Sequence, residues 1–417
     1  MFVLYCLMVP KIAFFSFGQN LFNFLIIVAL LFNYRYKTLV FKPLAPFIFL
    51  YLAQFIMIPF HDKVPYGIQV NAFRIEFMNT ILLPFAMINV AKKDDSSLYL
   101  FNKILMIVII VNATYSLVLT QMTGSNPYIT LLDTFRAGSH MDADYFSKYW
   151  AAKDSGRLFG RISGVFVHPM QNGLFLCFSV IFLLSIFSFN RALKSQIPLI
   201  VIMFSTFLAI LCIGIRTSIV ATGIGLLVFL LLERRVKVFF IGIISIIILL
   251  IIVQKVPGAQ EYVTSIFDTR SGAVRGSSFE MRLVQLNGCL REISHNYFFG
   301  NGFNWTAYYT SLYIKHPIML AFESLLIVIL CNGGFLGAVI WTLMIVMYIQ
   351  SVFQNFSDKH YRYTMITLIV IYLTYSVITG EYGYMRYFLI FYAVMWINGI
   401  QGKAQCHKVK RFNVKAI

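Results

Sequence analysis

Arg216 is a residue whose type and position invite a chemical role. It lies in Gly214-Ile215-Arg216-Thr217-Ser218, between two apolar runs. An arginine beside so much apolar sequence is costly unless water or an anion compensates its charge. One interpretation is a side chain that extends along its aliphatic stem to the aqueous interface. The other is a phosphate-binding guanidinium, because its planar, forked donors match phosphate oxygens.

A second group of polar residues precedes the apolar run that follows residue 169. Arg157 and Arg161 are followed by His168-Pro169 and Asn172. If a helix begins near Pro169, His168 and Asn172 share one face of it, since residues four apart are neighbours on a helix. A structural interpretation is equally open, because proline favours the first turn of a helix and Asn-Gly serves packing or turns.

His316 and Glu323 suggest acid-base chemistry. They are seven residues apart, nearly two helical turns, so they align on one face of a helix. A histidine beside an intramembrane carboxylate is a candidate general base with an orienting partner. The alternative is a helix-terminal histidine and a glutamate paired with an arginine. Arg74 and Glu76, in another apolar run, also need internal partners, as structural residues or as the polar wall of a lumen.

Arg282 lies in a segment with a different pattern. From Phe279 to Ile293, apolar residues recur at nearly helical intervals. This pattern predicts an amphipathic helix on the membrane surface, which places Arg282 near a lipid headgroup. Gly300-Asn301-Gly302 follows and offers backbone freedom, but it is weak as a motif.

The composition indicates whether these residues lie in water or in lipid. Of 417 residues, 59% are hydrophobic and only 12% are charged, whereas soluble chains carry about 25% charged residues. Most of the chain is therefore expected in lipid. The net charge of +18 comes from short clusters between apolar runs, which indicates membrane orientation and not nucleic-acid binding.

Several kinds of site have no signature in the chain. It has no GxxxxGK[ST] phosphate loop. The seven histidines and six cysteines lack metal-ligand spacing, and the triplet Asp142-Ala143-Asp144 alone is weak evidence for a metal. We therefore expect no cofactor and no metal.

The apolar runs predict a single integral membrane domain over 1–417, all α-helical, with about 12 transmembrane helices. The apolar N-terminus is interpreted as a retained first span. The expected spans are 2–16, 19–34, 43–60, 68–91, 98–120, 165–189, 196–214, 217–232, 237–254, 335–352, 364–380 and 386–400.

Lysines and arginines in the short loops predict the orientation. One side receives Arg35/Lys37/Lys42, Lys92/Lys93, Arg191/Lys194, Arg234/Arg235/Lys237, Lys359/Arg362 and a basic tail, Lys403/Lys408/Lys410/Arg411/Lys415. The opposite short loops hold only Lys11, Lys63, Arg216 and Arg386. We therefore expect the clustered side, with both termini, to be cytoplasmic.

Two long segments are then extracytoplasmic loops, 121–164 and 255–334. Loops of this length are usually functional. Counting Ile318–Cys331 as a full span would place the basic tail outside. We therefore expect Pro317–Cys331 to form a re-entrant or interfacial helix, broken at Asn332-Gly333-Gly334.

The order of these features resembles that of the O-antigen polymerase and O-antigen ligase superfamily of bacterial surface polysaccharide assembly. The stretches that carry the resemblance are GRISGVFVHPMQNG (160–173), IRTSIVATG (215–223), FEMRLVQLNGCLREISHNYFFGNGF (279–303) and HPIMLAFESLLIVILCNGGFLGAVI (316–340). With the span arrangement they cover most of the chain. The match is architectural more than literal, and His-Pro-Met-Gln-Asn stands here where the family often has Asn-Pro-Asn.

The resemblance implies a metal-independent, inverting glycosyl transfer at the outer face of the bacterial inner membrane. The partner would be an oligosaccharide on undecaprenyl pyrophosphate, with a chain-length regulator and a flippase as further possible partners. The family's outer-face arginine is matched by Arg216, its second-loop arginine by Arg282 and its loop-end histidine by His316. We expect His316 and Glu323 to be catalytic. The substrate would be bound by the set Arg216, Arg282, Arg161, Arg157, His168 and Asn172.

Three functions remain open at this point. A polymerase joins repeat units into O-antigen, capsule or exopolysaccharide, and we favour it. A ligase that moves finished polymer to an acceptor shares the donor chemistry. A lipid-linked oligosaccharide flippase or other transporter would distribute polar residues through its spans and have modest outer loops. The few intramembrane charges and the long outer loops disfavour it.

Overall fold

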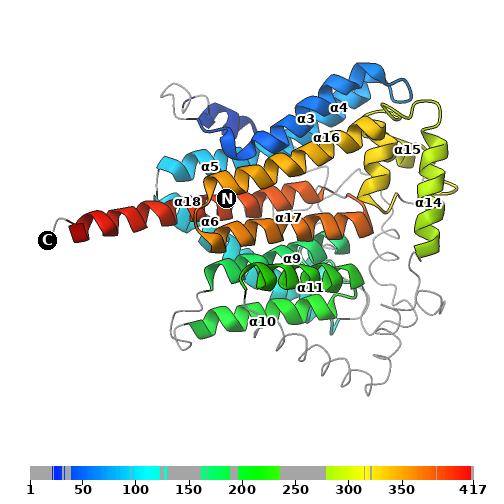
Figure 1. Cartoon of the computed structure of the whole chain (residues 1–417). Helices are drawn as coiled ribbons and strands as arrows, with labels where there is room; N and C mark the ends of the chain where they lie inside the picture. The colour runs from blue at the N-terminus through cyan, green and yellow to red at the C-terminus, as the bar shows by residue number, and fades with distance from the viewer. Residues whose placement is uncertain are drawn as a thin grey trace.

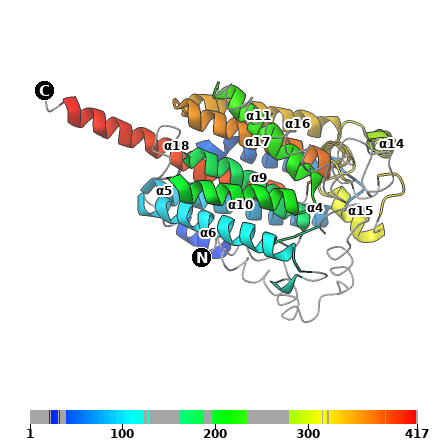
Figure 2. The same cartoon turned by 90° about the horizontal axis from the view of Figure 1, so that it is seen from below.

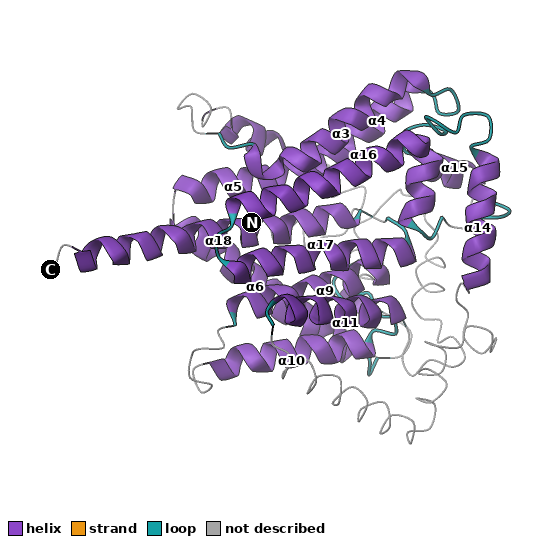
Figure 3. Ribbon diagram, viewed as in Figure 1, coloured by secondary structure: helices purple, strands orange, loops and turns teal. Residues whose placement is uncertain are grey.

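The computed structural model describes residues 21, 23–30, 32, 39–93, 95–122, 126–128, 161–166, 168–187, 196–234, 279–313, 315–319, 322–381 and 383–414. In these ranges the elements of regular structure are helices (Figure 3). They are α3 (Ala45–Met57), α4 (Tyr66–Phe77), α5 (Leu83–Lys93), α6 (Asp95–Leu119), α9 (Pro169–Ile186), α10 (Ile197–Cys212), α11 (Arg216–Leu232), α14 (Phe279–Glu292), α15 (Trp305–Tyr313), α16 (Leu325–Asn355), α17 (Lys359–Thr379) and α18 (Tyr384–Val414).

Six helical segments of the described chain are long and apolar enough to cross a membrane. They are Lys42–Phe60, Tyr66–Lys92, Leu98–Leu119, Pro169–Ile186, Leu325–Asn355 and Lys359–Thr379. The protein is therefore a multi-pass membrane protein, and the helical class predicted from composition is confirmed for the described residues. The expected spans 196–214 and 217–232 correspond to the shorter apolar helices α10 and α11. The expected spans 2–16 and 237–254 lie outside the described residues, and 19–34 is described only in part.

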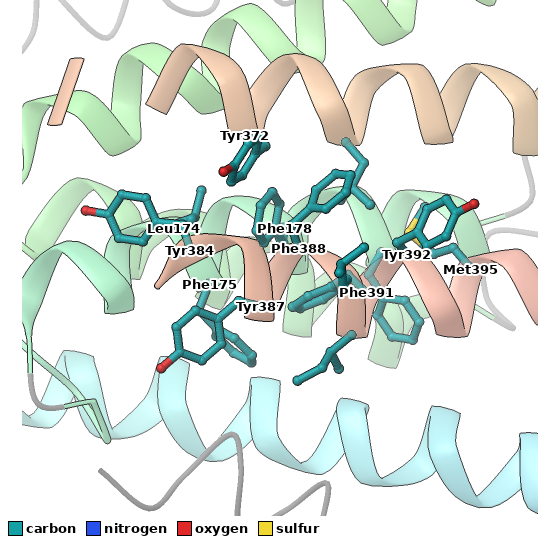
Figure 4. Close-up of a cluster of buried hydrophobic side chains, with 14 of the residues drawn as sticks. Leu174, Phe175, Phe178, Tyr372, Tyr384, Tyr387, Phe388, Phe391, Tyr392 and Met395 are labelled. Atoms are coloured by element: carbon teal, nitrogen blue, oxygen red, sulfur yellow. The ribbon is translucent and has the colours of Figure 1, made fainter. Parts of the chain in front are cut away.

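Helix α18 runs through the centre of the bundle, where it packs against α5, α9 and α17 (Figure 1). From Tyr384 to Ile397 its side chains are buried on every face, as expected for a helix surrounded by other helices. Aromatic rings fill the contact with α9 and α17 (Figure 4). Phe391, for example, meets Phe175 with ring centroids 5.3 Å apart at an interplanar angle of 63°. Such edge-on pairs contribute about 0.5–1.5 kcal/mol each.

Buried tyrosine hydroxyls connect the helices. Tyr348 of α16 donates a hydrogen bond to Met365 O of α17 at 2.8 Å, and Tyr375 of α17 donates to Met170 O of α9 at 2.8 Å. Because lipid is as apolar as the side chains, the hydrophobic effect does little to hold membrane helices together. Close packing and these hydrogen bonds take its place.

The connections between helices lie at the two ends of the bundle. At one end, His360 Nδ1 lies 2.9 Å from Glu233 Oε1, and His360 Nε2 lies 3.2 Å from Ser185 O. These contacts join the ends of α9 and α11 to the start of α17. The start of α3, the end of α5 and the start of α17 lie at this end (Figure 1) and carry Lys42, Lys92 and Arg362, so we call it the basic end. Helices α14 and α15 lie at the opposite end, away from the C-terminal extension of α18 (Figures 1 and 2). We call this the pocket end.

The helix expected over Pro317–Cys331 begins later, at Leu325, and this part of the prediction is wrong. Phe322 has a left-handed φ of 52°, and Ser324 is extended with φ −154°; neither conformation continues a helix. The expected break is present, because Gly334 has φ 59° and ψ −155° inside α16. Gly334 thus separates two helical parts of α16, 325–333 and 335–355, and the second part coincides with the span expected at 335–352.

Two glycine-asparagine segments meet at this break. Asn301 N donates to Cys331 O at 2.8 Å, and Gly302 N donates to Asn332 O at 3.0 Å. A Cβ on Gly334 would lie 2.5 Å from Tyr297 O and Phe298 O. The close approach of the two backbones therefore requires glycine, and it fixes the second loop onto α16.

Replacing Gly334 with alanine should destabilise the pocket end. The side chain is strained at this φ and collides with two carbonyls, and strain of this kind costs about 1–3 kcal/mol. Gly333→Ala is the matched control, because a Cβ there meets only Met57 Cε at 3.6 Å. We expect a lower unfolding temperature in detergent for Gly334→Ala and little change for Gly333→Ala. Equal unfolding temperatures for the two variants would contradict this account of the break.

Candidate active site

A cavity of about 800 Å³ opens between the helices at the pocket end. Its walls come from α3, α4, α16, the end of α17 and the start of α18, with Phe303 and Asn304 of the second loop beside them. Deeper in the bundle, Trp341 and Tyr372 line it. The lining residues that carry charge or titrate include Tyr51, His61, Glu76, His168, Tyr372, Glu381 and Arg386. A cavity of this size accommodates a ligand of several rings.

Two glutamates face this cavity, each with a tyrosine partner. Glu76 projects from α4, and Tyr51 of α3 donates to its Oε1 at 3.4 Å. Glu381 lies in the turn between α17 and α18, and Tyr372 donates to its Oε2 at 3.1 Å. The backbone N–H of Met385 also donates to Glu381 Oε1, at 3.2 Å. The turn and the first residues of α18 therefore hold the Glu381 carboxylate in one position.

The environment of Glu381 raises its pKa to about 7. Burial is the largest cause, because it penalises the charged form, and the negative charge of Glu76 acts in the same direction. Hydrogen bonds from Met385, Tyr372 and Tyr384 oppose the shift only in part. A carboxyl group with a pKa near neutrality is well placed to accept or donate a proton at physiological pH.

Arg386 brings a positive charge to the same cavity. It lies in the first turn of α18, its side chain lines the cavity, and it is only 7% exposed. Its Cζ lies 6.0 Å from the centroid of the Tyr387 ring. Its forked donors suit a phosphate or carboxylate ligand. The turn before α18 thus carries the Glu381 carboxylate, and the first turn of α18 carries the Arg386 cation five residues later.

The helix that carries Glu76 is irregular next to the cavity. A π-helical turn over Met78–Leu82 joins α4 to α5, and Asn79 and Thr80 of this turn line the cavity. Insertions of this kind shift the register of the side chains that follow them, and they recur at functional sites.

Two histidines add neutral hydrogen-bonding groups. His61 Nε2 lies 2.8 Å from Phe299 O and so carries the hydrogen, while its buried Nδ1 has no protein partner in the described part of the chain. His168 caps α9, where its Nδ1 accepts from Met170 N at 3.2 Å. Burial, with a smaller effect of the Arg161 charge, lowers the pKa of His168 to about 4. His168 is therefore a neutral ring that lines the cavity.

Asn172 has a structural role in this arrangement. It is fully buried, its Oδ1 accepts from Asn112 Nδ2 at 2.8 Å, and its Nδ2 donates to Ser116 Oγ at 3.1 Å and Ile162 O at 3.0 Å. These bonds hold the segment that carries Arg161 and His168 against α6. Asn172 thus positions a cavity wall, and it is not one of the described residues that line the cavity.

The backbone segments that carry Arg161 and Arg216 lie side by side at the pocket end. Ile162 N donates to Ile213 O at 3.2 Å, which sets the residue after Arg161 beside the turn before α11. Arg216 is the first residue of α11 and is half-buried. Neither arginine is among the described residues that line the cavity.

His316 is part of the packing of the second loop. Its Nδ1 accepts from Ile318 N at 3.2 Å and from Met319 N at 3.1 Å, which leaves the hydrogen of the neutral ring on Nε2. This nitrogen lies 3.5 Å from Glu292 Oε2. The ring faces Glu292 of α14, and Glu323 does not share a helix face with it because residues 322–324 are not helical. Both ring nitrogens of His316 thus have partners, the two backbone N–H groups at Nδ1 and the Glu292 carboxylate at Nε2.

The other sequence-predicted residues are described less fully. Arg282 lies in α14, which confirms the helix predicted from Phe279, but its side chain is outside the described part of the structure, as is all of Arg157. Glu323 is half-buried just before α16. The sequence predicts an apolar face for α14, but the face that the structure buries is a different one, which includes Gln285 and Cys289. Leu283 and Leu286 are exposed.

Replacing His316 with asparagine should preserve much of the function, whereas alanine should not. Asparagine offers an oxygen near the position of Nδ1 for the two backbone N–H groups, while alanine leaves them buried without an acceptor, at a cost of about 1–3 kcal/mol. We expect a lower unfolding temperature for His316→Ala than for His316→Asn, and an activity within about tenfold of wild type for the latter. A loss of about 10²–10⁴-fold in a stable asparagine variant would restore His316 as the general base.

Sequence reasoning missed Glu381, Arg386 and His61 as site residues. Arg386 was counted only as a loop charge for orientation, and Glu381 lies in the same short connection, between Gly380 and Gly383. The sequence did contain a signal for this site: a carboxylate and an arginine lie five residues apart where two predicted spans are connected. Glu76 was recognised as needing a partner or a lumen, and it lines the cavity.

Comparison with known proteins yields no relative from which to assign this cavity. No model of a protein family matches the chain, and no curated protein matches it. The function of the chain therefore has to follow from the chemistry of its own residues.

Proposed function

We propose that this chain is a polysaccharide polymerase, a glycosyltransferase that joins undecaprenyl-pyrophosphate-linked oligosaccharide repeat units into O-antigen, capsule or exopolysaccharide. The observation that carries the proposal is the cavity at the pocket end, where the Glu381 carboxyl group, held by Tyr372 and Met385, and the buried Arg386 line one space inside a membrane bundle. The resemblance of the sequence to the O-antigen polymerase and ligase superfamily points in the same direction.

The cavity residues suit an inverting transfer without a metal. Glu381 accepts the proton of the acceptor hydroxyl as its oxygen attacks the anomeric carbon of the donor sugar. The bond from that carbon to the diphosphate oxygen breaks, and the lipid diphosphate leaves with the electron pair. Arg386 stabilises the negative charge that develops on the leaving group, because fixed donors in a water-poor site act strongly on developing charge.

The distribution of basic residues supports a location of this chemistry on the periplasmic side of the bacterial inner membrane. Lysines and arginines cluster in the turns of the basic end, and such clusters remain cytoplasmic. Both termini are then cytoplasmic, and the cavity lies at the outer end. Helices α3, α4 and α16, which line the cavity, expose apolar side chains such as Phe55, Ile68 and Leu326, and such a surface suits the tail of a lipid-linked donor.

A ligase would use the same donor and leaving group, and a flippase would use the cavity only for binding. The test uses purified full-length protein in nanodiscs with lipid-linked single repeat units and no energy source. A polymerase produces a ladder of longer lipid-linked chains. No elongation, together with transfer of preformed polymer to an acceptor or with movement of the lipid-linked unit across vesicles, would refute the proposal in favour of the ligase or the transporter.

A further inference from the structure

Two cysteines from separate elements meet at the pocket end, outside the cavity. Cys289 lies in α14 and Cys331 in α16, 42 residues later, and their Sγ atoms are 3.3 Å apart. Both side chains are fully buried. Met319 Sδ lies 3.8 Å from Cys331 Sγ, so the two thiols are enclosed by apolar and sulfur-containing groups.

The pair lies where α14 and its neighbours attach to the bundle. Gly288, next to Cys289, packs so closely against Ile318 that an added Cβ would lie 2.6 Å from its Cγ2. Cys331 O accepts the hydrogen bond from Asn301 N that holds the second loop to α16. A covalent bond between the two cysteines would therefore secure the loop that supplies Phe303 and Asn304 to the cavity wall.

The distance and the compartment both favour oxidation. A disulfide needs its sulfurs about 2.05 Å apart, so closing the present gap requires a side-chain adjustment of about 1.2 Å. Under the orientation of the proposed function, on which this inference rests, the pocket end faces the periplasm, where disulfides form and persist. The other two described free thiols, Cys177 and Cys212, lie in the separate apolar helices α9 and α10.

We propose that Cys289 and Cys331 form a disulfide that staples the second extracytoplasmic loop to α16. One cysteine thiolate attacks the disulfide of a periplasmic thiol oxidase and forms a mixed disulfide. The other thiolate then attacks the mixed disulfide and releases the oxidase as a dithiol. The two cysteines lose two protons and two electrons, and the oxidase disulfide takes up both. Because both thiols are buried in the folded protein, the bond forms before α14 packs against α16.

Peptide mass spectrometry of the full-length protein tests the disulfide. Membranes are denatured in the presence of N-ethylmaleimide, then reduced and treated with an isotopically heavy form of the reagent. We expect the heavy label at Cys289 and Cys331 and the light label at Cys177 and Cys212. Light label at both Cys289 and Cys331 would overturn the proposal.

Serine variants provide the control. Cys289→Ser should expose Cys331 to the light label, and Cys331→Ser should do the same for Cys289. The double variant should unfold several degrees lower than the wild-type protein under non-reducing conditions, and reduction should lower the unfolding temperature of the wild-type protein only. If either single variant leaves the remaining cysteine in the heavy-labelled fraction, the pairing is wrong.

The result of the labelling experiment can be distinguished from the result of the elongation assay. An impermeant label on a cysteine introduced at the exposed position Ser294 reports the side of the membrane that this loop occupies. Reduced cysteines in a loop shown to be periplasmic refute the disulfide and leave the polymerase standing. A disulfide in a protein that fails to elongate refutes the polymerase alone.

Discussion

Glu381→Gln should lower the rate of glycan elongation by about 10²–10⁴-fold, the usual contribution of a general base. Glutamine preserves the hydrogen bond from Tyr372 but cannot accept a proton. In the wild-type protein the rate should rise with pH through about 7, because the raised pKa keeps the Glu381 carboxyl protonated below that value. The measurement is the initial elongation rate in nanodiscs from pH 5.5 to 8.5.

The stability of the same variant separates catalysis from folding. A carboxyl group whose pKa is raised in the folded state stabilises the fold most when it is protonated, and this contribution is lost as the pH rises through the folded pKa. Glu381→Gln should therefore unfold no more easily than the wild-type protein above pH 7. Glu76→Gln should move the pH profile to lower pH, because the charge of Glu76 contributes to the raised pKa of Glu381.

Glu233→Gln is the matched control for Glu381. Glu233 is a carboxylate at the basic end, 2.9 Å from His360, and it lies outside the described lining of the cavity. Its replacement should leave the elongation rate and its pH profile unchanged. An elongation rate for Glu381→Gln equal to that of this control would exclude Glu381 as the base.

Arg386→Ala should lower elongation by about 10²–10³-fold, the usual cost of removing one group that stabilises developing negative charge. The effect should fall mainly on kcat, since the charge on the leaving diphosphate grows as the anomeric bond breaks. Arg386→Lys should restore little of it, because an ammonium lacks the planar fork of donors. Single-turnover kinetics with lipid-linked repeat units measure this step.

Arg74→Ala is the comparison for Arg386. Arg74 also projects from a helix that borders the cavity, but it is exposed, donates to Asn71 at 2.8 Å and is not among the described lining residues. We expect nearly wild-type rates for Arg74→Ala. If Arg386→Ala elongates normally while Arg216→Ala does not, the diphosphate binds at the arginine that the sequence singled out.

The helices of this protein follow from its sequence because their cause is local. Lipid offers no hydrogen-bond partners, so each crossing must be a run of apolar residues in helical form. For this reason the spans expected at 43–60, 98–120 and 364–380 coincide with helices of the structure. The glycine break at Gly334 was also visible, since a positive φ favours one residue type.

The start of α16 shows the limit of this local reasoning. Pro317 and the apolar residues after it favour a helix, and His316 caps a first turn by accepting the backbone N–H groups of Ile318 and Met319. The chain nevertheless leaves the helical conformation at Phe322, whose φ is 52°. Phe322 packs against Trp305 and Tyr309 of α15, and these long-range contacts leave no local pattern in the sequence. His316 and Glu323 were predicted as a dyad from a helical spacing that this loop does not adopt.

The sequence by itself determined which of the described segments form long apolar helices, because an apolar run acts residue by residue. Only the tertiary structure decided which polar side chains meet. Glu76, Glu381 and Arg386 come from segments some three hundred residues apart in the chain and line one cavity. Their association depends on the packing of α3, α4, α16 and α18, and long-range packing leaves no periodic signal in a single sequence.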